Sequence, residues 1–187
     1  DITFNAAIAT ALYGGILGDT GSFRHANTTS EVLMIAGELL KFDINPAALA
    51  REIFSSQPLS FLRLLGDALS GMQPAQDGQL VWMVVGYEQF QAFGADPANS
   101  DQLVSFARML DTAEIAMVFR ETSPGEIRLG LRANQLDVGS LARHLGGGGH
   151  KLASGATLRG DLQEVATQVV KIAEHYLLTG ELDEWHC

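Results

Sequence analysis

Near the start of the chain, a turn of small residues carries the first groups that could do chemistry. Asp19 follows an apolar run and lies between Gly18 and Gly21, and Arg24 and His25 come at the end of the same short segment. Glycine lets the backbone approach a ligand closely, and hard metal ions prefer carboxylate oxygens. Asp19 is therefore a candidate metal ligand. The alternative is an aspartate that caps the following turn, with Arg24 and His25 as solvated surface groups.

A second candidate site is a run of four glycines that ends at Gly149 and is followed by His150 and Lys151. Glycine loses more conformational freedom on folding than other residues, so four in a row indicate tight bending or N–H groups turned toward an anion. The run lacks the lysine and hydroxyl spacing of a P-loop and the preceding strand of a dinucleotide-binding turn. It is a candidate phosphate cradle, and the alternative is a flexible linker.

Two arginines stand at the ends of expected strands. Arg120 follows an apolar run at 115–119, and Arg132 follows another at 127–131. A guanidinium offers forked donors that match phosphate and carboxylate oxygens. Each arginine is therefore a candidate phosphate contact, and the alternative is an ordinary surface residue.

Helical periodicity dominates the first 72 residues. Apolar positions 4, 8, 12 and 16 predict one buried helix face. Thr29 is expected to cap the next helix, and Pro46 is expected to open the one after it. This part of the chain is predicted to be mostly helical.

The pattern changes after a polar segment at 74–78 that contains proline and glycine. Strands are predicted at 80–85, 115–119 and 127–131, alternating with helices at 101–110, 137–145 and 161–178. We therefore expect an α/β protein. Its mostly helical part covers residues 1–73, a linker covers 74–78, and a smaller α/β domain with a mixed sheet covers 79–187.

Composition limits the class of protein. Hydrophobic residues make up 47% of the 187 residues, and the net charge is −10. These values exclude a disordered chain and argue against a broad basic face for duplex nucleic acid. A single cysteine, Cys187, excludes a disulfide within the chain. No apolar run approaches 18 residues, so we expect a soluble, cytoplasmic protein that does not insert into a membrane.

The two motifs, in this order, resemble those of the DHH phosphoesterase family with its C-terminal DHH-associated domain. The bacterial nanoRNase and phosphoadenosine-phosphate phosphatase type, related to RecJ, is the most similar subgroup. The resemblance rests on Asp19-Thr20-Gly21-Ser22-Phe23-Arg24, Asn27-Thr28-Thr29, Leu103-Val104, and the glycine run with His150, Ala153 and Gly155.

The resemblance implies a two-manganese phosphoesterase, with magnesium as the alternative metal. One domain would supply the metal ligands, and the second would bind substrate. Asp19 would be the final metal-binding aspartate, and Arg24 and His25 would border the cleft. The phosphate or nucleotide would be held by Arg132, Gly147, Gly148, Gly149 and His150.

The sequence departs from the family pattern in two ways. Ala133 stands where the family usually has serine, so one hydroxyl contact is missing or is supplied by another residue. The family's upstream motifs, rich in His and Asp, are absent, and one aspartate cannot hold two metal ions. We therefore expect a C-terminal part of such an enzyme that is inactive alone.

The leading hypothesis is a phosphoesterase that acts on short single-stranded oligonucleotides or nucleotide bisphosphates, with a homodimer as a compatible assembly. A non-catalytic module that binds a nucleotide or cyclic dinucleotide is the first alternative. The second is an enzyme similar to an exopolyphosphatase.

Overall fold

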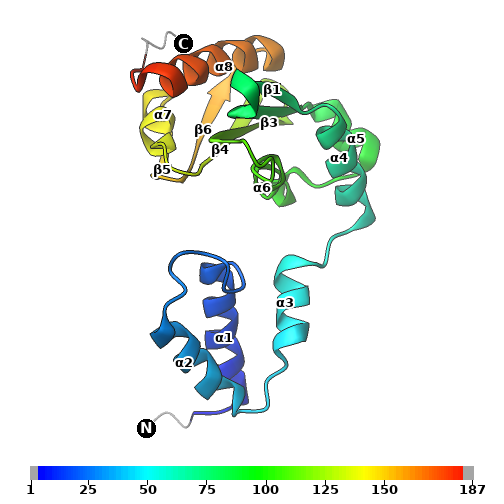
Figure 1. Cartoon of the computed structure of the whole chain (residues 1–187). Helices are drawn as coiled ribbons and strands as arrows, with labels where there is room; N and C mark the ends of the chain where they lie inside the picture. Colours follow the sequence, from blue (N-terminus) through cyan, green and yellow to red (C-terminus); the bar gives the residue numbers. More distant parts are fainter. Residues whose placement is uncertain (1–3, 183–187) are drawn as a thin grey trace. The chain divides into compact units, whose positions relative to one another are not determined.

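The computed structural model describes residues 4–182, which fall into two compact units (Figure 1). The first unit ends at Gln57 and the second begins at Pro58. Cys187 and the end of the expected second domain lie outside the described residues. Among the described helices, none has the length and apolar character needed to cross a bilayer.

The first unit is helical, as its sequence predicted. Its helices are α1 (Ala6–Thr20), α2 (Ser30–Leu40) and α3 (Pro46–Phe54). Thr29 caps α2 by accepting a hydrogen bond from the Val32 N–H, and Pro46 occupies the first turn of α3. Both expected helix starts are confirmed.

The buried face of α1 differs from the expected one. Ala9, Tyr13 and Leu17 enter the core of the unit, whereas Leu12 is 50% exposed. Both sets of positions repeat every four residues, so the periodicity gave the helix but placed its buried face one position away. The small residues that fill the rest of α1 offered no contrast to settle the choice.

The second unit is a mixed sheet with helices packed on it. Its helices are α4 (Leu59–Ser70), α5 (Tyr87–Phe93), α6 (Leu103–Ala107), α7 (Val138–His144) and α8 (Leu162–Thr179). Its strands are β1 (Gln73–Ala75), β2 (Leu80–Val85), β3 (Ile115–Ser123), β4 (Glu126–Ala133), β5 (Gly148–His150) and β6 (Ala153–Arg159). Short 3-10 turns lie at η1 (Gln76–Gly78) and η2 (Pro97–Asn99).

The strand order in the sheet is β1-β2-β3-β4-β6-β5, with β2 and β3 parallel and the other neighbours antiparallel. Alternate residues of the strands supply two cores. Helices α7 and α8 pack in one core with Leu80, Met117 and Leu129, and α4, α5 and α6 pack in the other with Val81 and Val118 (Figure 1). The mixed α/β fold expected from the sequence is confirmed.

The packing boundary differs from the expected domain boundary. Phe61, Leu64 and Ala68 of α4 share a core with β2, so α4 belongs to the second unit. Residues 74–78, expected as a linker, complete β1 and form η1, and β1 pairs with β2. The polar composition of this segment suits a tight turn as well as a linker.

The glycine run was expected as a loop, but part of it is a strand. Gly148 to His150 form β5, which pairs with β6. Glycine and alanine carry no hydrophobic alternation, so this hairpin left no strand pattern in the sequence. The flexible-linker alternative is therefore wrong.

Candidate functional site

The turn after α1 gathers Asp19, Arg24 and His25. Asp19 lies in the last turn of α1, and its carboxylate Oδ2 accepts a hydrogen bond of 2.8 Å from Asn27 Nδ2. His25 Nδ1 lies 3.2 Å from the backbone carbonyl oxygen of Asp19. In the turn that follows Asp19, the Phe23 N–H donates to Thr20 Oγ1 at 3.0 Å, and α2 is capped by Thr29.

The backbone of this turn is strained. Gly21, Ser22 and Phe23 have φ values of 56°, 59° and 62°, a conformation that costs energy for non-glycine residues. Arg24 donates from Nε to the Gly21 carbonyl at 2.7 Å, and its guanidinium carbon lies 5.9 Å from the centre of the Phe54 ring. Arg24 is therefore tied to its own unit by both its charge and its donors.

The described residues do not fit a two-metal centre by themselves. Between residues 4 and 182, no group of three or more His, Cys, Asp or Glu side chains is arranged to hold a metal ion. Asp19 supplies one carboxylate, and Asn27 already donates to it. A two-metal site needs several carboxylates and imidazoles.

Among the described residues of the second unit, no helix covers most of one face of strands β4, β6 and β5. Ile127, Leu129 and Leu131 point to the core with α7 and α8, whereas Arg128 and Arg132 on the opposite face are at least partly exposed. On that opposite face, α6 reaches β4 where Val104 packs over Gly130. We call the uncovered area of β4, β6 and β5 the open face.

On the open face, Arg132 and His150 lie in one row of paired residues that runs across the strands. We call such a row a level of the sheet. Arg132 pairs with Ala153, and Ala153 pairs with His150 in the next strand. Neighbouring strands lie about 4.8 Å apart, so about 10 Å separates the Cα atoms of Arg132 and His150. The small side chain of Ala153 between them leaves room for a ligand group that both could contact.

Glycines next to this level bring backbones close together. A Cβ on Gly147 would lie 2.2 Å from the Gly155 carbonyl oxygen. Gly149 has a φ of 136°, and a Cβ there would lie 2.6 Å from the Ser154 Cα. The Gly147 N–H donates to the Ala142 carbonyl at 2.7 Å, so this donor is not turned toward an anion. The glycine run therefore provides close packing, and Gly147 does not act as the N–H donor that we expected.

A small pocket on the same face was only partly visible in the sequence. Arg120 and Arg128 line it together with Asp101, Thr157 and the backbone of Gly147. Strand-end position had indicated Arg120. Arg128 could have been found from the alternation of β4, but nothing in the sequence pointed to Asp101 or Thr157.

Positive charge concentrates around the open face. Burial, and then the charge of Arg108, lower the pKa of Arg132, and Arg120 lowers it further while Asp101 raises it. Arginine stays protonated in proteins, so Arg132 carries its charge in a partly buried position, where Arg108 and Arg120 repel it and Asp101 attracts it. This cluster attracts anions locally, although the chain as a whole has a net charge of −10.

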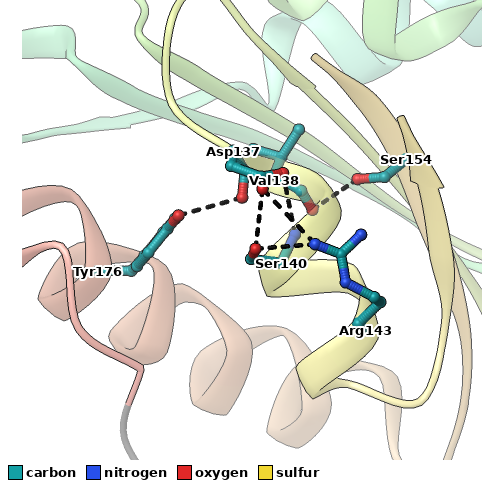
Figure 2. Close-up of polar contacts among 6 residues, drawn as sticks. All are labelled: Asp137, Val138, Ser140, Arg143, Ser154 and Tyr176. Atoms are coloured by element: carbon teal, nitrogen blue, oxygen red, sulfur yellow. Dashed lines mark hydrogen bonds and ion pairs between the residues drawn. The ribbon is translucent and has the colours of Figure 1, made fainter. Parts of the chain in front are cut away.

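A polar network fixes the glycine hairpin to α7 (Figure 2). Asp137 caps α7 and accepts hydrogen bonds from the Ser140 N–H and hydroxyl at 3.1 and 2.9 Å. The Ser154 hydroxyl donates to the Val138 carbonyl at 2.6 Å, and the Tyr176 hydroxyl donates to the Asp137 carbonyl at 3.1 Å. The network joins α7, β6 and α8, so it fixes the strand that carries Ala153 and Gly155.

Asp137 should make the second unit sensitive to acid. The Ser140 hydroxyl, more than any other group, lowers the pKa of Asp137 below its ordinary value of 3.8. The ionised carboxylate is thus favoured by folding, and its stabilisation is present above pH 3.8 and is lost as the pH falls through the lowered pKa. We expect Asp137→Asn to weaken the response of unfolding free energy to acid, measured by urea unfolding at neutral and acidic pH. Equal acid sensitivity of both proteins would contradict this role.

With the geometry in place, comparison with known proteins defines the class. The model of the DHHA1 domain matches residues 78–178, so the chain belongs to the DHHA1 domain family. The resemblance found in the two motifs is thereby confirmed. The match covers β2 to α8 and includes the whole open face.

Individual relatives extend the similarity beyond that domain. A probable bifunctional oligoribonuclease and PAP phosphatase NrnA of Streptococcus mutans is 35% identical over 79% of this chain and 47% of its own length. The bifunctional oligoribonuclease and PAP phosphatase NrnA of Thermus thermophilus is 34% identical over 94% of this chain and 53% of its own length. The chain thus spans about half the length of these curated relatives.

A solved structure shares the fold. The crystal structure of an exopolyphosphatase-related protein from Bacteroides fragilis superimposes with a TM-score of 0.85 at 27% identity. The match covers 95% of this chain and 53% of that protein.

Proposed function

We propose that this protein is part of a phosphoesterase for short single-stranded oligonucleotides or nucleotide bisphosphates, and that its second unit binds the substrate. The observation that carries the proposal is the open face, where Arg132 and His150 stand at one level beside a cluster of arginines. Charge-assisted hydrogen bonds from such groups favour phosphate oxygens. The named activities of the NrnA relatives support this substrate class.

Two residues of the open face, Arg132 and His150, would contact the substrate, and Gly147 would support them. The Arg132 guanidinium offers a forked pair of donors, and the His150 imidazole offers a second contact across the level of Ala153. Gly147 lets the hairpin pack directly on β6, which keeps His150 in place. The second unit would hold and orient the substrate.

The first unit would contribute Asp19 to the part of the site where the phosphate ester is hydrolysed. We propose manganese, or magnesium in its place, as the metal of the complete enzyme, with Asp19 as one ligand and Arg24 and His25 beside it. Such metals activate water and polarise phosphoryl oxygens. The other ligands would come from outside the described residues, because these do not assemble a metal site.

The exopolyphosphatase-related neighbour supports a second candidate activity, the hydrolysis of polyphosphate. An open face with several arginines also suits a linear polyanion. The two candidates differ in whether a nucleoside is required, and a binding experiment can therefore separate them.

A calorimetric titration of the 187-residue chain tests the proposal. Adenosine 3′,5′-bisphosphate and a 5′-phosphorylated dinucleotide should bind more tightly than polyphosphate, a cyclic dinucleotide or a short RNA duplex. With manganese, the same chain should bind the dinucleotide without hydrolysing it, because the described residues do not assemble a metal site. Preference for polyphosphate would favour the second candidate, and preference for the cyclic dinucleotide would favour a non-catalytic module. Metal-dependent hydrolysis by this chain would contradict the proposal that the other metal ligands come from outside the described residues.

A further inference from the structure

We propose that the pocket bounded by Arg120, Arg128 and Thr157 is a second phosphate subsite, which binds the phosphate of a neighbouring nucleotide and so selects oligonucleotides over single nucleotides. The proposal rests on the proposed function, because Arg132 and His150 would hold the first nucleotide. It adds a site at the other end of the open face.

Three adjacent strands bring the side chains of this pocket to one level. Arg120 of β3 pairs with Arg128 of β4, and Arg128 pairs with Thr157 of β6. All three side chains lie on the face opposite the core with α7 and α8, because their strand neighbours Phe119, Leu129 and Leu158 belong to that core. Two guanidinium groups and a hydroxyl thus line one pocket.

The charged guanidinium group of Arg120 is buried, whereas the carboxylate that pairs with it is exposed to solvent. Its side chain is 8% exposed, and Nη1 donates to the Ser100 hydroxyl at 2.9 Å. Nη1 also forms an ion pair with Asp101, whose side chain is 83% exposed. An exposed carboxylate contributes little to stability and exchanges readily, whereas the buried guanidinium needs an anion beside it. Asp101 therefore occupies the place that a phosphate would take.

Arg128 is similarly available. Its side chain is 53% exposed, and its only ion pair within the described residues joins Nη2 to Glu126 Oε1 at 3.3 Å. Such surface pairs are weak, and Glu126 contacts only one guanidinium nitrogen, so a phosphate that accepts from both arms of the guanidinium can compete with it. Asp101 and Glu126 balance the two arginines while the pocket lacks a ligand.

The pocket has the size of a small group. It encloses about 340 Å³, near the lower limit for ligand pockets, and Gly147 and Gly155 contribute backbone to it. Arg128 lies four residues before Arg132 on the same face, which places their Cα atoms about 13 Å apart along β4. A nucleoside monophosphate has one phosphate and cannot offer phosphate oxygens to both arginines, whereas an oligonucleotide can present a separate phosphate to each of these two long side chains.

Two substitutions test the subsite in the 187-residue chain, with AMP and a 5′-phosphorylated adenine trinucleotide as ligands. Arg128→Gln should weaken trinucleotide binding about tenfold and AMP binding less than twofold. Asp101→Asn should tighten trinucleotide binding several-fold, because it removes the competing carboxylate. The matched control is Arg63→Gln, which removes the same charge from an exposed position on α4 and should change neither affinity more than twofold.

Inorganic phosphate provides a readout that does not depend on the proposed function. Its addition should shift the amide NMR signals of Gly155 and Thr157, and Arg128→Gln should abolish these shifts. If these shifts occur while no nucleotide binds, the subsite stands and the proposed function fails. If the trinucleotide depends on Arg132 but not on Arg128, the proposed function stands and the subsite fails. Absence of the phosphate shifts, or weaker trinucleotide binding by Asp101→Asn, would also overturn the subsite.

Discussion

Gly147→Ala is expected to destabilise the second unit by about 3 kcal/mol and to disrupt the glycine hairpin, because the site cannot accept even one methyl group. The added Cβ would lie 2.2 Å from the Gly155 carbonyl oxygen and 2.6 Å from the Ala156 Cα. Both contacts are with backbone, so no side chain can rotate away. Urea unfolding followed by tryptophan fluorescence measures the loss, since Trp82 lies in β2 of this unit and neither tryptophan lies in residues 4–57.

Gly148→Ala is the matched control. Gly148 is the next residue in the same run, yet no atom lies within 4 Å of the position that its Cβ would take, and its φ is not positive. The free energy of unfolding should change by less than about 1 kcal/mol. If both substitutions destabilised the protein equally, the run would be needed for its general flexibility, and close packing at Gly147 would not explain it.

Much of the fold could be predicted because helices and central strands carry periodic apolar residues. The segment 80–85 was predicted as a strand and is β2, and 161–178 was predicted as a helix and lies within one residue of α8. The hairpin of β5 and β6 could not be predicted, because glycine, alanine and serine dominate its residues. Its structure depends on close backbone contacts that leave no trace in hydrophobicity.

The sequence predicted which residues belong to the candidate site but not how they are arranged in space. Arg132 and His150 were both singled out, yet only the order of β4, β6 and β5 shows that they share one level of the sheet. Arg128 and Asp101 were not singled out, because in the sequence alone each resembles an ordinary surface residue. Asp101 lies 19 residues before Arg120 in the sequence, and the two side chains meet only after β3 folds beside η2.

Arg132→Ala and His150→Ala should produce the largest losses of nucleotide binding. A charge-assisted hydrogen bond contributes about 1.5 to 3 kcal/mol, so Arg132→Ala should weaken binding of adenosine 3′,5′-bisphosphate about 10- to 150-fold. Arg132→Lys should recover only part of this loss, because lysine keeps the charge but lacks the fork of donors. Arg63→Ala on α4 controls for the loss of one positive charge from the same unit.

The metal dependence of this binding separates the roles of the two units. Arg132 and His150 both belong to the second unit, whereas the candidate metal ligand Asp19 belongs to the first. Calorimetric titrations in the presence of EDTA should therefore give the same affinity as titrations with manganese, and both should show the same losses in the variants. Binding that required manganese would mean that the second unit is not sufficient for substrate recognition. Binding that survived Arg132→Ala and His150→Ala together would place the nucleotide elsewhere on the chain, because the strand partners of Arg132, Ala116 and Ala153, have no side-chain donors to replace them.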